Sequence, residues 1–470
     1  MICSWLVAVS GNTATERSQA RGRSAAAARD TRSPVRALTG AHTRIVWVQG
    51  DGTDPYAAGY SLVLKGLDTD DGKGERVILG ERASYLKPML ISGGKRIVFS
   101  SHGKDPAQVK TFVVNWDGTG RSQLADGFGL AVWEDPGTGR DWVYLGTDNS
   151  TKDPGNFRTV SRFQVDRPGV RELVWNKTLV SGDTFQVSAD GKTAGGLFPW
   201  PQAGVAELPN GQLRTFGEGC WTAFRDAGPG LFWFFDGSHR NVTIVDRAAN
   251  RRWMVALNKA PGFDGAEAYH PRWANHPRFV AISGPYNQGG QNQVRSGGRQ
   301  AEIYLGRFSA DYSRIEAWAR VTENSAGDSY PDVWIDRARS PHAAELARAA
   351  DRIPTPAPSK KTVVVDARLA SATTIPAPRS LAPYRNALVV NVYDVAGVVQ
   401  GEYKDRRILV AQWAIRDARV LDEARQRAVG TTARLTLERY DAHPELEGER
   451  LIAASGGPDL PLYYDVTPRR

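Results

Sequence analysis

The sequence contains very little cysteine. Of its 470 residues, only Cys3 and Cys220 are cysteines. We expect Cys3 to belong to a leader, so the mature chain would hold a single thiol. A disulfide framework is therefore excluded, and a zinc site built on cysteine has no support. A nucleophilic Cys220 would need a histidine neighbour and a lowered pKa, and the plainer interpretation is a lone buried thiol.

Long apolar runs and runs of one charge are also missing. No segment reaches the roughly 20 apolar residues of a membrane-spanning helix, so we predict no membrane span. The formal net charge is +9, from 60 Lys and Arg against 51 Asp and Glu, but the excess is spread along the chain. Without a basic run or a nucleic-acid-binding motif, we predict that nucleic acid is not a partner. An acidic glycan or another polyanion stays open.

Established catalytic motifs are absent as well. The sequence has no Gly-x-Ser-x-Gly elbow, no His-Glu-x-x-His pair and no phosphate-binding loop. It therefore assigns no cofactor, and it leaves both metal binding and enzymatic activity undecided.

Glycine, proline and tryptophan are plentiful. The 48 Gly and 27 Pro lie between short apolar runs, which indicates an all-β chain with many turns. The 14 Trp suit wide gaps between packed sheets and, for some of them, surfaces that bind sugars or peptides.

A loose repeat of about 40–55 residues recurs between residues 42 and 336. Each copy begins with a short strand that often contains Pro or Trp, continues through a Gly or Asp turn, and adds further apolar strands. Five copies are recognisable, and they open near Lys87, Leu130, Phe185, Trp221 and His270. This pattern predicts the blades of a β-propeller.

Two leftover fragments complete a sixth unit. Residues 330–335 look like an opening strand with nothing after it, and the strands that start at residue 44 look like a unit without its opening strand. Joining them closes the ring with strands from both ends of the domain and removes exposed sheet edges. We therefore predict a six-bladed β-propeller over 42–336, in which 330–335 pairs with the sheet formed by 43–79.

Two turns of the repeat resemble a known family. The segments Ser188-Ala-Asp-Gly-Lys192 and Asn115-Trp-Asp-Gly-Thr119 contain Asp-Gly, which tolerates the positive φ of a tight turn. They resemble the repeats of TolB-type propellers, and the resemblance extends over about 290 residues. It implies the fold but not the function, because propellers of this kind serve as scaffolds, peptidase gates and lyases.

The regions before and after the propeller differ in composition. Residues 2–9 form a short apolar stretch that resembles the end of a signal peptide, and residues 11–41, rich in Ala, Arg, Ser and Thr, are predicted to be disordered. We interpret 1–41 as a leader, which implies a secreted or periplasmic protein. Residues 337–361 are predicted to be a linker, with a short helix from Ser340 and then a Pro-rich stretch.

Residues 362–470 are predicted to form a small β-barrel-like domain. The order of its strand-like runs resembles that of netrin-type OB-like barrels, with the segment Val395-Ala-Gly-Val-Val-Gln-Gly401 in the place of a family motif. The cysteines of the animal forms are missing. The resemblance implies a small binding or packing module, and we identify no catalytic set in it.

Propeller geometry predicts where a site would lie. The start of each inner strand and the loop after each second strand meet at one rim of the ring. Residues at these positions are therefore predicted to converge on one mouth of the channel, namely His102, His239, His270, Arg272 and Tyr286. The long loop 284–300 is predicted to reach over the same mouth. Amide and aromatic side chains together are common in sugar sites.

Two functions from different classes fit this mouth. The first is a binding protein for a glycan or an envelope partner, with binding residues His102, Trp200, Trp221, Asn287 and Gln288. The second is a polysaccharide lyase, in which His270, His239 and Tyr286 transfer protons and Arg272 neutralises a uronate carboxylate. A structural interpretation also stays open, in which His270 and Arg272 only hold neighbouring blades together.

Overall fold

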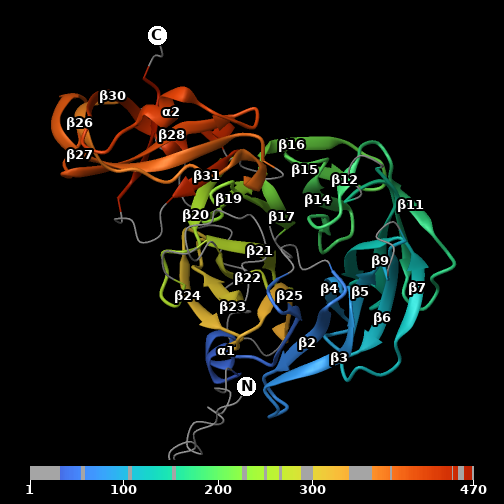
Figure 1. Ribbon diagram of the computed structural model, residues 1–470. Coiled ribbons are helices and arrows are strands. Elements are labelled where there is room, and N and C mark those ends of the chain that lie inside the picture. Colours follow the sequence, from blue (N-terminus) through green and yellow to red (C-terminus); the bar gives the residue numbers. More distant parts are fainter. Residues whose placement is uncertain are drawn as a thin grey trace, which may run out of the picture.

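The molecule is described by a computed structural model. It covers residues 32–53, 59–103, 108–150, 155–224, 230–247, 251–263, 267–286, 300–337, 362–381, 384–446, 448–453 and 460–467. Within these residues six β-sheets surround a central channel, and a second β domain lies against one side of the ring (Figure 1).

Each sheet is one antiparallel blade, and blades 2 to 6 follow the chain from the channel outward. Blade 2 contains β4 (Leu86–Ile91), β5 (Arg96–Ser101), β6 (Lys110–Asn115) and β7 (Ser122–Asp126). Blade 3 contains β8 (Phe128–Glu134), β9 (Asp141–Asn149), β10 (Asn156–Gln164) and β11 (Glu172–Trp175), and β12 (Val180–Ser181) also pairs with β10. Blade 4 contains β13 (Gln186–Val187), β14 (Thr193–Leu197), β15 (Gln202–Glu207) and β16 (Leu213–Glu218). Blade 5 contains β17 (Cys220–Phe224), β18 (Leu231–Phe235), β19 (Asn241–Asp246) and β20 (Arg251–Ala256). Blade 6 contains β21 (Glu267–Trp273), β22 (Phe279–Tyr286), β23 (Glu302–Phe308) and β24 (Ile315–Arg320).

Blade 1 closes the ring with strands from both ends of the domain. Its innermost strand β25 (Gly327–Ile335) pairs with β1 (Thr43–Gly50), and β2 (Leu62–Asp68) and β3 (Glu75–Ala83) follow outward. The antiparallel register runs from Thr43 opposite Ile335 to Gly50 opposite Gly327. The predicted six-bladed propeller and its closure by residues 330–335 are confirmed.

Tryptophan fills the spaces between blades, as its abundance suggested. Trp47, Trp175 and Trp233 are fully buried, and each belongs to a different apolar cluster. A side chain of this size suits the wedge-shaped gap between two twisted sheets that diverge from a common axis.

The segment before the propeller differs from our expectation. Residues 11–41 were predicted to be disordered, but Arg32–Thr39 form helix α1. Val35 and Leu38, three residues apart on one face of this helix, are buried in the cluster that also contains Ile45 and Val321. The prediction missed the helix because its polar composition hides a short apolar stripe. Residues 1–31 lie outside the described residues.

The C-terminal domain contains a closed five-stranded barrel. Its strands are β26 (Val363–Ser371), β27 (Ala387–Gln400), β28 (Arg407–Arg416), β30 (Thr432–Arg439) and β32 (Leu462–Asp465). The pairing order is β26-β27-β28-β32-β30 and back to β26, and only the β28–β32 pair is parallel within this ring. This order is compatible with the OB-like arrangement that the sequence suggested. The accessory strands β29 (Arg419–Val420) and β31 (Arg450–Ala453) extend the sheet, and α2 (Asp422–Gln426) lies between β29 and β30.

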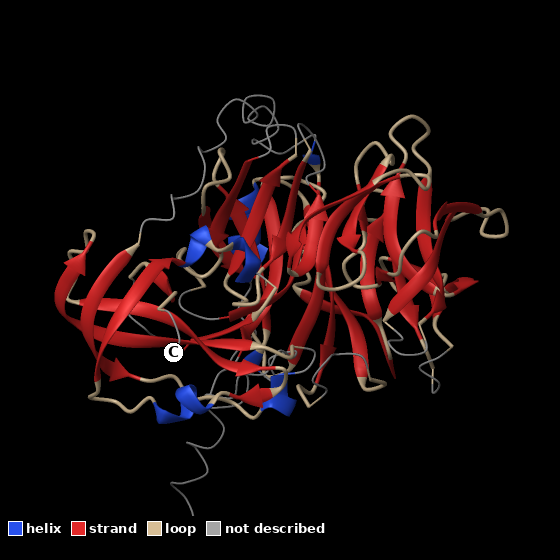
Figure 2. Cartoon of the chain, turned by 90° about the horizontal axis from the view of Figure 1, so that it is seen from above, coloured by secondary structure: helices blue, strands red, loops and turns tan. Residues whose placement is uncertain are grey.

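The barrel and the propeller share one apolar core. Leu381, Tyr384 and Ile452 of the barrel domain lie in the same buried cluster as Trp233 and Phe263 of the propeller. Figure 2 shows the barrel domain beside the ring. Across the junction, the Leu451 amide donates a hydrogen bond to the Gly237 carbonyl at 2.9 Å. The linker that we predicted over 337–361, with its short helix, lies outside the described residues except for Arg337. Among the helices described, none has the length and apolar composition that crossing a membrane requires.

Candidate functional site

Four of the six innermost strands share a local backbone feature, a residue other than glycine with positive φ. Lys87, Trp221, His270 and Tyr330 have φ between 36° and 54°, and each lies at a register irregularity of its strand. A left-handed conformation costs a residue other than glycine about 1–2 kcal/mol. The rings of His270 and Tyr330 have centroids 4.0 Å apart, and those of His270 and Trp221 are 5.0 Å apart, although they come from three blades.

An aromatic cluster continues from these residues to the end of the channel where the innermost strands begin, which we call the barrel end. His239 stacks on Tyr269 at 5.1 Å, and Tyr269 lies 4.6 Å from His270. Tyr384, from the barrel domain, contacts Trp200 at 5.6 Å, and its hydroxyl lies 3.4 Å from His239 Nε2. The barrel domain therefore places an aromatic side chain at this end of the propeller.

Four titratable groups at the barrel end have pKa values that favour their neutral forms. Burial lowers the pKa of His270 to about 3. Burial, together with the charges of Arg450, His270 and Arg240, also holds the pKa of His239 well below its usual value. Burial raises the pKa of the Cys220 thiol and of the Tyr384 hydroxyl, which lie 2.7 Å apart. Cys220 is thus a buried thiol without the lowered pKa that a nucleophile needs.

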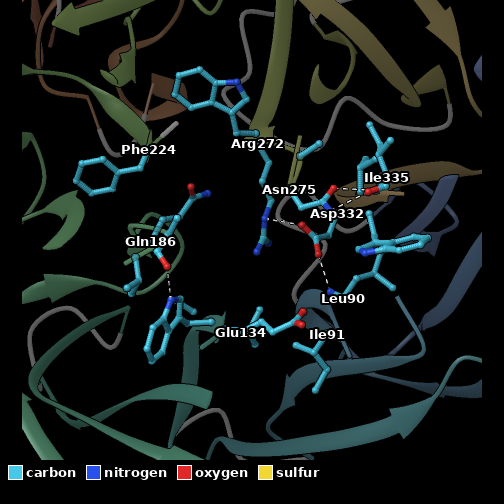
Figure 3. Close-up of a pocket in the computed structure, with 18 of the residues that line it drawn as sticks. Leu90, Ile91, Glu134, Gln186, Phe224, Arg272, Asn275, Asp332 and Ile335 are labelled. Atoms are coloured by element: carbon cyan, nitrogen blue, oxygen red, sulfur yellow. Dashed lines mark hydrogen bonds and ion pairs between the residues drawn. The ribbon is translucent and has the colours of Figure 1, made fainter. Parts of the chain in front are cut away.

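A cavity of about 480 Å³ opens at the other end of the channel, where the innermost strands finish, and we call this the cavity end (Figure 3). All six innermost strands contribute to its wall, so it lies on the propeller axis. Its principal lining residues are Leu90, Trp133, Glu134, Gln186, Phe224, Arg272, Asn275, Asp332 and Trp334. The volume falls within the roughly 300–1,000 Å³ of small-molecule sites.

An ion pair forms one side of this cavity. Arg272 Nε lies 2.9 Å from Asp332 Oδ1, and Asp332 Oδ2 accepts a hydrogen bond from the Leu90 amide at 2.6 Å (Figure 3). The three residues come from the innermost strands of blades 6, 1 and 2. This arrangement matches the structural interpretation of Arg272, because the pair joins neighbouring blades.

Two other polar side chains of the cavity have no ion-pair or hydrogen-bond partner among the described residues. The Glu134 carboxylate is exposed in the cavity, and within the described part of the chain it accepts no hydrogen bond and forms no ion pair. Burial of part of the carboxyl group and the nearby charge of Asp141 raise the pKa of Glu134, while Arg337 opposes the shift. The Gln186 amide likewise forms no side-chain hydrogen bond with any described residue. Both groups can therefore bond to a ligand.

Two half-buried tryptophans flank these polar groups. A Cβ atom added to Gly191 would lie 2.7 Å from Trp133, and one added to Gly94 would lie 2.9 Å from Trp334. Both glycines have positive φ and belong to turns of the next blade. Because glycine supports one side of each indole, the two rings are fixed at the cavity wall.

A fully buried lysine lies between the two ends. Lys87 Nζ donates to the carbonyls of Leu130, Gly182 and Phe185 at 2.6, 2.7 and 3.1 Å. Burial and the charge of Arg272 lower the pKa of Lys87, and Asp183 opposes that shift. Three carbonyl acceptors nevertheless match the three N–H donors of an ammonium group. Lys87 thereby connects blade 2 to blades 3 and 4.

The structure brings some of the predicted site residues together and separates others. Trp200, Trp221, His239 and His270 all belong to the aromatic cluster at the barrel end. Arg272 lies at the cavity end instead, so the prediction that it shares a mouth with these histidines is wrong. The prediction ignored the direction of β21, which carries Arg272 two residues further along the channel than His270.

The remaining predicted residues are placed apart or are not described. The His102 ring contacts Tyr60 at 5.2 Å. Tyr286 is the last residue of β22 and pairs with Glu267, which places its backbone toward the barrel end, and nothing is described of its side chain. Asn287 and Gln288 lie outside the described residues.

Sequence reasoning missed the polar and aromatic residues of the cavity. Glu134, Asp332 and Trp334 lie near the ends of innermost strands, whereas the analysis considered only their beginnings. The sequence did contain a signal for these residues. Tyr330-Pro331 and His270-Pro271 mark the register irregularity of their strands, and strand alternation then places Asp332 and Arg272 at equivalent positions.

One group of side chains in the described residues has the composition of a metal site. Ligand atoms of His42, Asp68 and Asp70 lie within 4.8 Å of one another. However, Arg44 pairs with Asp68 at 2.7 Å and Arg36 pairs with Asp70 at 2.9 Å. These arginines already compensate the two carboxylates, so the group resembles a surface ion-pair network.

Comparison with known proteins gives similarity in fold only. No protein-family model matches the chain, and no curated protein matches it. Solved structures similar to it include TolB from Acinetobacter baumannii, with 16% identity, 64% of this chain and 69% of that chain covered, and a TM-score of 0.43. Hydrazine synthase of Kuenenia stuttgartiensis has 13% identity over 77% of this chain and 54% of its own, with a TM-score of 0.42. An oligogalacturonate lyase in complex with manganese has 11% identity, with 58% of this chain and 72% of that chain covered and a TM-score of 0.33. At these values the assignment of the propeller rests on the strand pairings of the chain itself.

Proposed function

We propose that the protein is a binding protein that recognises a glycan in the cavity end of its propeller. The observation that carries the proposal is the combination of two fixed indoles, Trp133 and Trp334, with two polar side chains, Glu134 and Gln186, that have no hydrogen-bond partner among the described residues. Sugar rings present C–H faces that pack on aromatic rings and hydroxyls that bond to carboxylates and amides. The volume of about 480 Å³ suits one or two sugar units at the end of a longer chain.

Binding fits the geometry better than a lyase reaction does. A lyase needs a proton acceptor close to a free cation that neutralises the substrate carboxylate. His270 is buried with its pKa lowered to about 3, which makes it a weak base. Arg272 is already paired with Asp332. No observation therefore favours the lyase, and we retain the non-catalytic function.

We extend the proposal to the location of the protein. A glycan ligand and the apolar stretch at residues 2–9 both suggest a periplasmic or secreted protein. Separation of cell fractions, followed by detection of the chain in each, tests this part independently. Recovery of the folded protein from the cytoplasm alone would contradict it.

The binding proposal is tested by screening purified protein against a panel of oligosaccharides, with tryptophan fluorescence as the first readout. A hit should be followed by calorimetry on wild type, Trp334→Ala and Trp253→Ala. Aromatic stacking contributes about 0.5–1.5 kcal/mol, so Trp334→Ala should weaken binding up to about tenfold. Trp253 on the outer strand β20 lies outside the cavity, and its variant should bind normally.

A broad panel without any binding would overturn the proposal. Equal loss of affinity in both tryptophan variants would also contradict it, because the effect would then not depend on the cavity. Circular dichroism of each variant shows whether it is folded, and Trp334→Phe replaces Trp334→Ala if the smaller side chain unfolds the blade.

A further inference from the structure

The charged groups along the channel differ in whether the protein itself satisfies them. Three cations lie along the channel, namely Lys87, Arg272 and Arg337, and the partners of the first two are defined. Lys87 donates to three carbonyl oxygens, and the Arg272 guanidinium pairs with Asp332 at 2.9 Å. Asp332 is thereby occupied as well, with the Leu90 amide as its second partner.

Asp141, another carboxylate of the cavity wall, is also compensated. It pairs with Arg96 at 3.0 Å, and it accepts a hydrogen bond from the Ser92 amide at 3.1 Å. Its charge therefore needs no ligand. It still acts on Glu134, because both carboxylates line the same cavity.

Glu134 is the exception in the cavity. Its carboxylate is exposed to the cavity and forms no hydrogen bond or ion pair with a described residue. Arg337 is near enough to affect its titration but forms no ion pair with it. The close-up in Figure 3 shows the Glu134 side chain directed into the cavity, opposite Arg272.

A second carboxylate without a close partner lies in the turn before β13. Asp183 has an exposed side chain and, among the described residues, neither a hydrogen bond nor an ion pair, although the charge of Lys87 acts on it. Burial raises the pKa of Asp183, and the nearby charge of Lys87 opposes the shift. Among the described residues, Glu134 and Asp183 are thus carboxylates without a hydrogen bond or ion pair, whereas Lys87 and Arg272 are paired.

From this asymmetry we infer that the cavity selects glycans that carry a free amino group, such as 2-amino-2-deoxyhexose units, with Glu134 pairing with the ammonium group. The inference rests on the proposed glycan binding and adds its chemical class. An ammonium group donates three hydrogen bonds and supplies the missing positive charge, whereas a neutral sugar supplies hydroxyls alone. A uronate would meet Glu134 with a like charge and would find Arg272 already paired.

The experiment compares two trisaccharides that differ only in acetylation. Calorimetry at pH 6.5, where the amine is charged, measures the affinity of wild type for the glucosamine trisaccharide and for its fully N-acetylated form. We expect the amino form to bind about tenfold or more tightly, with a preference that weakens as salt is added. Glu134→Gln should lower this preference to about twofold or less while the acetylated form binds as before.

A matched control replaces a carboxylate outside the cavity. Asp126 is 80% exposed on the outer strand β7, and Asp126→Asn should keep the full preference. If neither trisaccharide binds wild type, and the oligosaccharide panel also fails, the proposed function falls and the inference falls with it. If both forms bind equally, glycan binding stands and the selectivity is refuted. If Glu134→Gln keeps the preference, the assignment to Glu134 is refuted.

Discussion

The two ends of the channel are built by the same six innermost strands, yet the side chains at one end pack against one another and those at the other end face a cavity. At the barrel end, aromatic rings and neutral titratable groups pack against one another, and Tyr384 from the second domain joins them. At the cavity end, Glu134 and Gln186 lie beside two fixed indoles and have no side-chain partner in the part of the chain that the structure describes. The comparison teaches that an aromatic and histidine-rich rim can be a packed interior, whereas unsatisfied polar groups beside empty volume indicate a binding site.

The largest effect is expected where the two domains meet. Arg450 is fully buried, and it pairs with Glu267 at 2.7 Å and donates to the Gly237 carbonyl at 2.9 Å. Arg450→Ala removes the closest cation of the buried Glu267 carboxylate and leaves Arg240 at 3.9 Å, so the free energy of unfolding should fall by about 3–5 kcal/mol. Urea unfolding measures the change.

The control for this prediction is an exposed pair in the barrel. Arg434 and Asp366 lie 2.8 Å apart with 61% and 38% of their side chains exposed. Arg434→Ala should change stability by less than about 1 kcal/mol. A small effect of Arg450→Ala would contradict the prediction and would mean that apolar contacts, not this ion pair, hold the two domains together.

The second prediction concerns the pH dependence of ring closure near the barrel end. Asp328 begins the closing strand β25 and accepts hydrogen bonds from Trp47 Nε1 at 3.0 Å and Gln49 Nε2 at 2.9 Å. Burial raises the pKa of Asp328 from 3.8 to about 7, although hydrogen bonds from Asn324 and Gln49 oppose the shift. The folded state therefore retains a proton that the unfolded state releases, so this stabilisation is full below about pH 4 and is lost as pH rises to about 7.

Comparison of wild type with Asp328→Asn isolates this group, because the other titrations cancel in the difference. The stability advantage of wild type should fall by about 1.4 kcal/mol per pH unit over that range, for a total on the order of 4 kcal/mol. Thermal unfolding at a series of pH values gives the slope. A difference that does not vary with pH would mean that Asp328 is ionised throughout.

The third prediction disturbs the cavity end without touching its polar groups. Gly191→Ala would place a methyl group 2.7 Å from the Trp133 ring. Gly139 has a similar φ of 66° against 70°, but an added Cβ there meets nothing within 4 Å. In both variants alanine must adopt a left-handed backbone conformation, so this cost is common to the two. Gly191→Ala should therefore be less stable than Gly139→Ala by about 1–3 kcal/mol, because only its methyl group is crowded.

The same pair of variants connects packing to binding. If Trp133 forms the sugar platform, only Gly191→Ala should weaken oligosaccharide binding in calorimetry, because only there does the indole have to move. If Gly191→Ala is destabilised but its affinity for the oligosaccharide is unchanged, Trp133 is not part of the binding site and Trp334 alone stacks on the sugar.

The smallest effect on stability is expected from the removal of a single hydroxyl group. Tyr384→Phe removes the hydroxyl that lies 2.7 Å from Cys220 Sγ and 3.4 Å from His239 Nε2. Loss of one buried hydrogen bond should destabilise the protein by about 0.5–1.5 kcal/mol. Ligand affinity at the cavity end should stay the same, and a clear change in affinity would show that the two ends are coupled.

Local sequence patterns were sufficient to predict the propeller and its closure. Residues 330–335 have the strand pattern of an opening strand, and β1 has the pattern of a second strand, so their pairing followed from counting complete units. The barrel could also be predicted, because its strand-like runs follow the Pro-rich linker in an order that resembles netrin-type OB-like barrels. The helix Arg32–Thr39 could not, because a two-residue apolar stripe becomes informative only when a partner surface is known.

What the sequence alone determined about this protein is the repeating architecture, since turns and strand alternation are properties of neighbouring residues. Only the tertiary structure decided which end of the channel is filled. Tyr384 reaches His239 across 145 residues, and Arg272 meets Asp332 from another blade. Such contacts depend on the shape and charge of surfaces that do not exist until the chain has folded, and no local pattern encodes them.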